Sequence, residues 1–129
     1  MVYLDGEELL RLHKIVIDFA GGSHGVRDAH LLASILEKPQ MEFGGEVFYP
    51  TVWDKAACYL ESLANFHVFV DGNKRTAVAV TSRFLRLNGY RLTATNKEIE
   101  SFIVEVVVKK FSVTVIAAWL KKHAKKLSR

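Results

Sequence analysis

The chain has few of the features that mark secreted or membrane proteins. Cysteine occurs once, at Cys58, so no internal disulfide can form, which favours a reducing compartment. No apolar run approaches the length needed to cross a bilayer, and the N-terminus lacks a basic segment followed by an apolar core. We therefore expect a cytoplasmic protein that does not contact the membrane.

Repeats, low-complexity tracts and linkers rich in Pro, Gly or Ser are also missing. Half of the 129 residues are hydrophobic, enough for one core without disulfides or structural metals. We therefore expect a single domain over residues 1–129. Cys58 should be a buried packing residue, because no neighbouring pattern supplies a base or cation that would lower its pKa.

Acidic residues are absent from the C-terminal tail, residues 121–129, which holds five of the 18 Lys and Arg residues. The rest of the chain has 13 basic and 14 acidic residues, so the net charge of +4 belongs to the tail. Such a tail could contact nucleic acid or an acidic partner. A solvated cationic run at the end of a helix, favoured by the helix dipole, is the interpretation we prefer.

Capping signals divide the chain into helices. Each is a Ser, Thr or Asp at the start of an apolar pattern of helical spacing, and Gly pairs or Pro mark several ends. Leu9, Leu12, Val16 and Phe19 form the apolar pattern of the first helix. The predicted caps are Asp5, Asp28, Thr51, Thr95 and Ser112, and another helix should run from about Asn73 to Asn88-Gly89.

Two segments depart from a helical pattern. Residues 43–48 contain the Gly44-Gly45 pair of a short hairpin or flap, too short to build a sheet. Residues 102–108 are rich in β-branched side chains and would pass for a strand on propensity alone. A lone strand there would lack a partner, so we predict a helix. The expected fold class is all-α: six helices with one short β-hairpin.

The segment from His67 to Arg75 has the densest group of chemically active side chains. A helix beginning near Asn73 would offer free backbone N–H groups and the positive end of its dipole, beside the charges of Lys74 and Arg75. Gly72 permits a turn and close approach of backbone to a ligand. Asp71 among these cations suggests a divalent metal. Together they predict a phosphate site.

Ordinary roles compete with this hypothesis. An isolated His67 is more often a surface or packing residue, and it can share a side with Phe69 only if the segment is bent. Asp71 could simply cap the following helix. Lys74 and Arg75 could be solvated charges. Spacing excludes a P-loop and a protein-kinase catalytic loop, and no His has a companion at zinc-ligand spacing.

The run His67-x-Phe69-x-Asp71-Gly72-Asn73-Lys74-Arg75 resembles the signature of the Fic/Doc superfamily. The common Fic pattern, H-x-F-x-[DE]-G-N-G-R-x-x-R, has Gly where Lys74 stands and Arg where Val78 stands. Proteins of the Doc (death-on-curing) branch share both departures, so the chain resembles that branch. Flanking stretches along most of the chain support the resemblance, and they include Gly21-Gly22, Phe43-Gly44-Gly45 and Asn88-Gly89.

The resemblance implies a toxin of a toxin–antitoxin pair that transfers the γ-phosphate of Mg-ATP to a hydroxyl of a translation factor such as elongation factor Tu. His67 would be the base, Asp71 the Mg²⁺ ligand, and Gly72, Asn73, Lys74 and Arg75 the phosphate binders. The flap (Phe43, Gly44, Gly45, Glu46, Val47) would dock the target by strand addition.

A separate antitoxin is implied as well, with its C-terminal segment in the toxin's groove, and nucleic acid would be contacted only through it. Two alternatives stay open. One is transfer of AMP to a protein hydroxyl, as in the common Fic proteins. The other is a nonenzymatic module that binds an antitoxin or nucleic acid.

Overall fold

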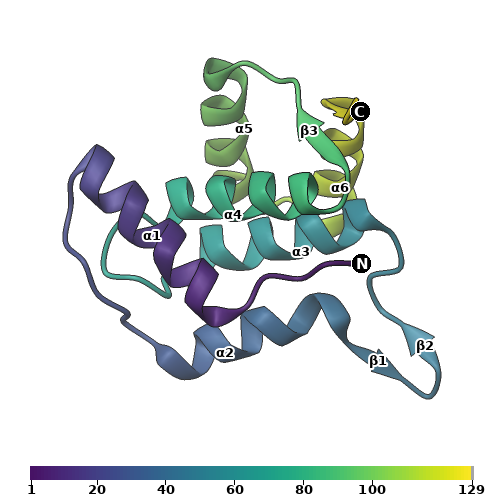
Figure 1. Cartoon of the computed structure of the whole chain (residues 1–129), viewed down its shortest axis with the longest axis horizontal. Coiled ribbons are helices and arrows are strands. Elements are labelled where there is room, and N and C mark those ends of the chain that lie inside the picture. The colour runs from purple at the N-terminus through teal and green to yellow at the C-terminus, as the bar shows by residue number, and fades with distance from the viewer. Residues whose placement is uncertain (129) are drawn as a thin grey trace.

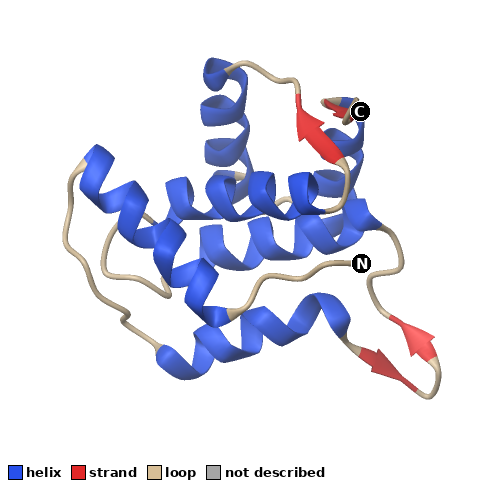
Figure 2. Ribbon diagram, in the orientation of Figure 1, coloured by secondary structure: helices blue, strands red, loops and turns tan. Residues whose placement is uncertain are grey.

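Helices dominate the computed structural model, which describes residues 1–128. Within this range six α-helices, one 3₁₀ helix and two small antiparallel ladders follow one another (Figures 1 and 2). The elements are α1 (Gly6–Ala20), α2 (Ala29–Glu37), η1 (Lys38–Gln40), β1 (Glu42–Phe43), β2 (Glu46–Val47), α3 (Val52–Asn65), α4 (Asn73–Leu87), β3 (Tyr90–Leu92), α5 (Asn96–Val108), α6 (Val113–Lys122) and β4 (Ala124–Lys126).

Five of the helices begin at the predicted caps. In each case the side chain of the cap accepts a hydrogen bond from the backbone N–H three residues further on. At Thr51 and Thr95 the acidic residue at that third position also bonds back to the cap, which completes a capping box. Each such cap contributes about 1 kcal/mol of stability. The sequence therefore placed these helix starts correctly.

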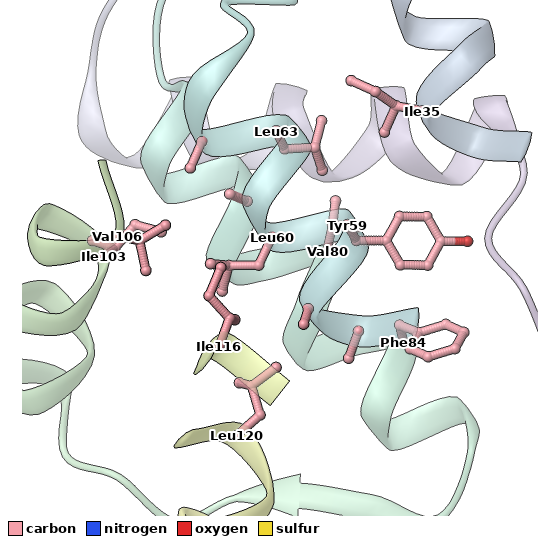
Figure 3. Close-up of a cluster of buried hydrophobic side chains, with 14 of the residues drawn as sticks. Ile35, Tyr59, Leu60, Leu63, Val80, Phe84, Ile103, Val106, Ile116 and Leu120 are labelled. Carbon is pink, nitrogen blue, oxygen red and sulfur yellow. The ribbon is translucent and has the colours of Figure 1, made fainter. Parts of the chain in front are cut away.

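Helix α3 forms the centre of the core. It packs most extensively against α4 and then against α6. Along α3, Tyr59 packs on Phe84 of α4, Leu60 lies towards Ile116 of α6 and Leu63 lies towards Ile35 of α2 (Figure 3), and all of them are at most 4% exposed. Small residues on α3 let the neighbouring helices approach closely, as expected for the middle of a bundle.

Residues 102–108 are helical, as predicted against their β propensity. They form the second half of α5, and Phe102, Ile103 and Val106 are buried in the core. Burial along one helical face thus outweighs the modest cost of β-branched side chains in a helix.

The prediction for the apolar face of α1 was wrong at Phe19, which is 89% exposed. Leu9 is buried as predicted, but the other buried residues of α1 are His13 and Ile17, which follow it at intervals of four. Phe19 falls on the flank of this stripe, where it lines a groove rather than the core. The apolar pattern predicted the wrong face because a polar residue, His13, occupies the middle of the buried one.

A second ladder was not predicted. Strand β4 pairs antiparallel with β3, with Tyr90 opposite Lys126 and Leu92 opposite Ala124. The predicted tail is therefore only partly a solvated run at a helix end: residues 121–122 finish α6, whereas 124–126 add to a strand, with Lys125 and Lys126 exposed. Arg129, the last residue of that tail, lies outside the described residues.

Cys58 is 1% exposed, as expected of a packing residue. Burial raises the pKa of its thiol to about 11, so it stays protonated at neutral pH. Within residues 1–128, no helix combines the length and the apolar character needed to traverse a membrane.

Candidate functional site

The predicted catalytic, metal and phosphate-binding residues meet on the motif loop, residues 66–72, and on the first turn of α4. The loop connects the end of α3 to the start of α4 and lies beside α1 (Figure 1). Backbone hydrogen bonds join it to the segment after α1: Arg27 N–H donates to Val68 O at 2.7 Å, and Val70 N–H donates to Gly25 O at 3.1 Å. An antiparallel bridge between Val26 and Phe69 completes this pairing.

The bend that the sequence could not show is located at His67. Its φ of +50° lies in the left-handed region, which His adopts more readily than most residues. The Arg27 guanidinium donates to the His67 carbonyl at 3.2 Å, which supports the bent backbone. His67 is exposed, whereas Phe69 is 1% exposed and faces the core. The bent segment thus leaves His67 accessible while Phe69 is buried.

Asn73 closes the loop with its side chain. Its Oδ1 accepts from Phe69 N–H and its Nδ2 donates to Phe69 O, both at 3.0 Å. The amide side chain is thus occupied by the loop. Any part that Asn73 plays in phosphate binding would come from its backbone N–H at the start of α4.

Asp71 does not cap α4, which was the competing role for its carboxylate. Its Oδ2 accepts from Ser23 N–H at 2.7 Å, and the side chain is exposed. Gly22 lies beside it with a φ of +112°, and a Cβ at Gly22 would come within 3.1 Å of Asp71 Cβ. The segment after α1 therefore fixes one carboxylate oxygen and leaves the other side of the group accessible.

The N-terminus of α4 has no side-chain cap. Its N-cap residue is Gly72, in the left-handed conformation with φ +75°, and the first turn contains no acidic residue. Lys74 and Arg75 are exposed on this turn, and within residues 1–128 neither forms an ion pair. Free N–H groups, the helix dipole and two cations thus coincide, an arrangement suited to an anion.

Comparison with known proteins agrees with the motif. The model of the Fic/DOC family matches residues 3–85. The chain belongs to the Fic/DOC family. It is similar to "Toxin Doc" of Mycolicibacterium smegmatis, with 47% identity over 92 residues that cover 71% of this chain and 68% of that protein. It is also 30% identical to "Protein kinase doc" of Escherichia phage P1, over 122 residues and 95% of both chains. These relatives place it in the Doc branch.

In this Fic/DOC chain a groove of about 820 Å³ opens beside the first turn of α4, and sequence reasoning identified none of its lining beyond Lys74 and Arg75. It runs between α4 and α5, with the exposed Phe19 of α1 on its wall. Lys74 and Arg75 form its cationic end, and Val78 lies further along it. The signal that could have indicated its apolar wall was Val78, which stands where the common Fic pattern has Arg.

The hairpin of β1 and β2 forms as predicted, with Glu42 opposite Val47 and Phe43 opposite Glu46. It stands at the right-hand end of α3 in Figure 1, whereas the motif loop is at the left-hand end. Helix α3 lies between them, and its 14 residues span about 21 Å along the helix axis. The structure therefore brings His67, Asp71, Gly72, Asn73, Lys74 and Arg75 together and places the flap residues Phe43, Gly44, Gly45, Glu46 and Val47 elsewhere.

Proposed function

We propose that this Doc-branch protein is a toxin that transfers the γ-phosphate of Mg-ATP to a Ser or Thr hydroxyl of a protein. The observation that carries the proposal is the uncapped N-terminus of α4, where Gly72 leaves the first N–H groups open beside Lys74 and Arg75. A triphosphate supplies the negative charge that this end of a helix favours. The name of the phage relative, "Protein kinase doc", supports the same reaction class.

The reaction needs a base for the acceptor hydroxyl, and His67 is the accessible imidazole of the motif loop. As the target oxygen bonds to the γ-phosphorus, the imidazole takes the hydroxyl proton. The bond from the γ-phosphorus to the bridging oxygen breaks, and ADP leaves. Lys74, Arg75 and the α4 N–H groups offset charge on the phosphates throughout.

Asp71 is suited to Mg²⁺. Within residues 1–128 no three His, Cys, Asp or Glu side chains gather into a metal-binding group. One carboxylate together with phosphate oxygens is a common way to hold Mg²⁺, and Asp71 keeps an accessible carboxylate beside the phosphate site. When bound, the ion would neutralise part of the phosphate charge.

A translation factor such as elongation factor Tu is the target class we propose, which places the reaction in the cytoplasm. The hairpin is the proposed docking element, because β1 and β2 pair only with each other in the described chain and Phe43 is 79% exposed. A target docked there by strand addition would have to reach the motif loop along α3, a helix of about 21 Å. The target would have to present its hydroxyl at the other end of that helix.

An antitoxin is the partner we propose for the groove beside α4. Its cationic end at Lys74 and Arg75 suits a carboxylate, and its wall at Val78, Ile99 and Ile103 suits an apolar face. An antitoxin segment bound there would occupy the residues proposed to hold phosphate. It would therefore silence the enzyme by excluding the nucleotide.

The test compares ATP labelled at the α- or the γ-phosphate, incubated with the protein, Mg²⁺ and purified elongation factor Tu or host lysate. We expect label on protein only from the γ position, and none after addition of the cognate antitoxin. Label from the α position would instead establish AMP transfer. Absence of transfer together with salt-dependent DNA binding would favour the nonenzymatic alternative.

A further inference from the structure

The imidazole of His13 is buried against the motif loop, although the proposed chemistry does not use it. His13 lies in the middle of α1 and is 4% exposed. Histidine is seldom buried to this extent without a specific hydrogen bond, because its polar ring nitrogens are costly to remove from water.

Two contacts attach this ring to the loop. Its Nε2 lies 2.9 Å from the backbone O of Asp71, and its plane stacks on Phe69 with the ring centroids 3.8 Å apart and an angle of 8°. A carbonyl oxygen only accepts, so Nε2 carries the proton and donates. The ring therefore contacts both the residue that anchors the loop in the core and the residue proposed to hold the metal.

Asp71 is consequently held at two points. Ser23 N–H fixes its carboxylate through Oδ2 at 2.7 Å, and His13 fixes its backbone through the carbonyl. The same peptide unit leads into Gly72, which packs on Ile17 one turn further along α1. The orientation of this peptide also sets where the first N–H groups of α4 begin.

We propose that His13 is a positioning residue of the transfer site. By donating to the Asp71 carbonyl it sets the direction of the Asp71 carboxylate and the start of α4. The effect on catalysis rests on the proposed function. The effect of His13 on the conformation of the motif loop does not depend on it.

Three variants separate the hydrogen bond from simple packing. His13→Phe keeps an aromatic ring over Phe69 and loses the donor. His13→Gln keeps an amide donor of similar reach, and His13→Asn has the same amide one carbon too short. Thr81→Val is the matched control, because it removes another buried hydrogen bond, from Thr81 Oγ1 to Ala77 O at 2.7 Å, in the middle of α4.

For γ-phosphate transfer we expect His13→Phe and His13→Asn to lower kcat by about 10- to 100-fold, the usual loss when the partner of a metal ligand is removed. The Mg²⁺ concentration for half-maximal rate should rise, whereas KM for the protein target stays within about twofold. His13→Gln should restore most of kcat. Thr81→Val should lower Tm and leave kcat unchanged.

Amide hydrogen exchange tests the same claim without activity. Residues 67–72 should exchange faster in His13→Phe and His13→Asn, and near the wild-type rate in His13→Gln and Thr81→Val. If wild-type protein transfers nothing, the proposed function fails, while this arm still decides the positioning role. Should His13→Phe not fold, the Gln and Asn pair decides it. Equal exchange and equal kcat in Gln and Asn would overturn the proposal.

Discussion

Gly72→Ala is the substitution whose effect the structure specifies most closely. Gly72 has a φ of +75°, and a Cβ built there would lie 2.9 Å from Ile17 Cδ1, closer than real Cβ contacts. A left-handed backbone costs a residue with Cβ about 1–2 kcal/mol. Ala also lowers the conformational entropy of the unfolded chain, which offsets about 0.4–1 kcal/mol of this cost. Ile17 Cδ1 is the end of a side chain that is 3% exposed, so moving it aside adds about 1 kcal/mol.

The expected loss for Gly72→Ala is therefore about 2 kcal/mol of unfolding free energy, or roughly 8 °C in Tm. Gly89→Ala is the matched control. Gly89 has a φ of +93° at the other end of α4, and nothing lies within 4 Å of a Cβ built there. It carries the backbone cost without the clash, so we expect about 1 kcal/mol, or roughly 4 °C.

The clash itself can be tested by a double-mutant cycle, since Ile17→Val removes the Cδ1 atom that a Cβ at position 72 would meet. Ile17→Val alone should cost about 0.5–1.5 kcal/mol. In the double variant the clash is absent, so its loss of unfolding free energy should be smaller than the sum of the losses of the two single variants. Thermal unfolding measures Tm. The rate of transfer of the γ-label measures whether displacement of the motif loop lowers activity. A Gly72→Ala protein with wild-type Tm and transfer would refute this reasoning.

Three further outcomes follow. His67→Asn should abolish transfer while Tm changes by at most about 2 °C, because the exposed residue keeps a type that tolerates positive φ; residual transfer above a tenth of wild type would contradict the base role. Burial raises the pKa of Cys58 from 9.0 to about 11, so the stability due to the neutral thiol is complete below pH 9 and is lost as pH rises through 11. Tm should therefore fall less between pH 9 and pH 11 in Cys58→Ala than in the wild-type protein, and an equal fall in both would argue against the raised pKa of Cys58. Phe43→Ser should raise KM for the protein target and leave Tm unchanged, since the ring is 79% exposed; an unchanged KM would remove the flap from docking.

Local signals predicted most of the fold. Five caps and the Asn88-Gly89 stop are encoded within a few residues, and the structure places helix boundaries there. The β3–β4 ladder was missed because it joins residues more than thirty positions apart, and neither strand exceeds three residues. Such pairing depends on where α5 and α6 return the chain, which no local pattern reveals.

The candidate site was predicted in position but not in detail. The motif loop and the start of α4 follow from residue types, yet the side chain of Asn73 serves the loop and that of Asp71 bonds Ser23 rather than capping α4. His13 was overlooked because its importance depends on a tertiary contact across 58 positions. The flap is separated from the motif by the length of α3, which residue patterns could not indicate.

The central claim, that the uncapped start of α4 holds a triphosphate, is tested most directly by the backbone amide resonances of the protein during titration with Mg-ATP. We predict the largest saturable shifts at the N–H groups of Asn73, Lys74 and Arg75, with Lys125 and Lys126 serving as exposed basic references on β4. Shifts confined to those two lysines, or no saturable shift on the first turn of α4, would contradict the account.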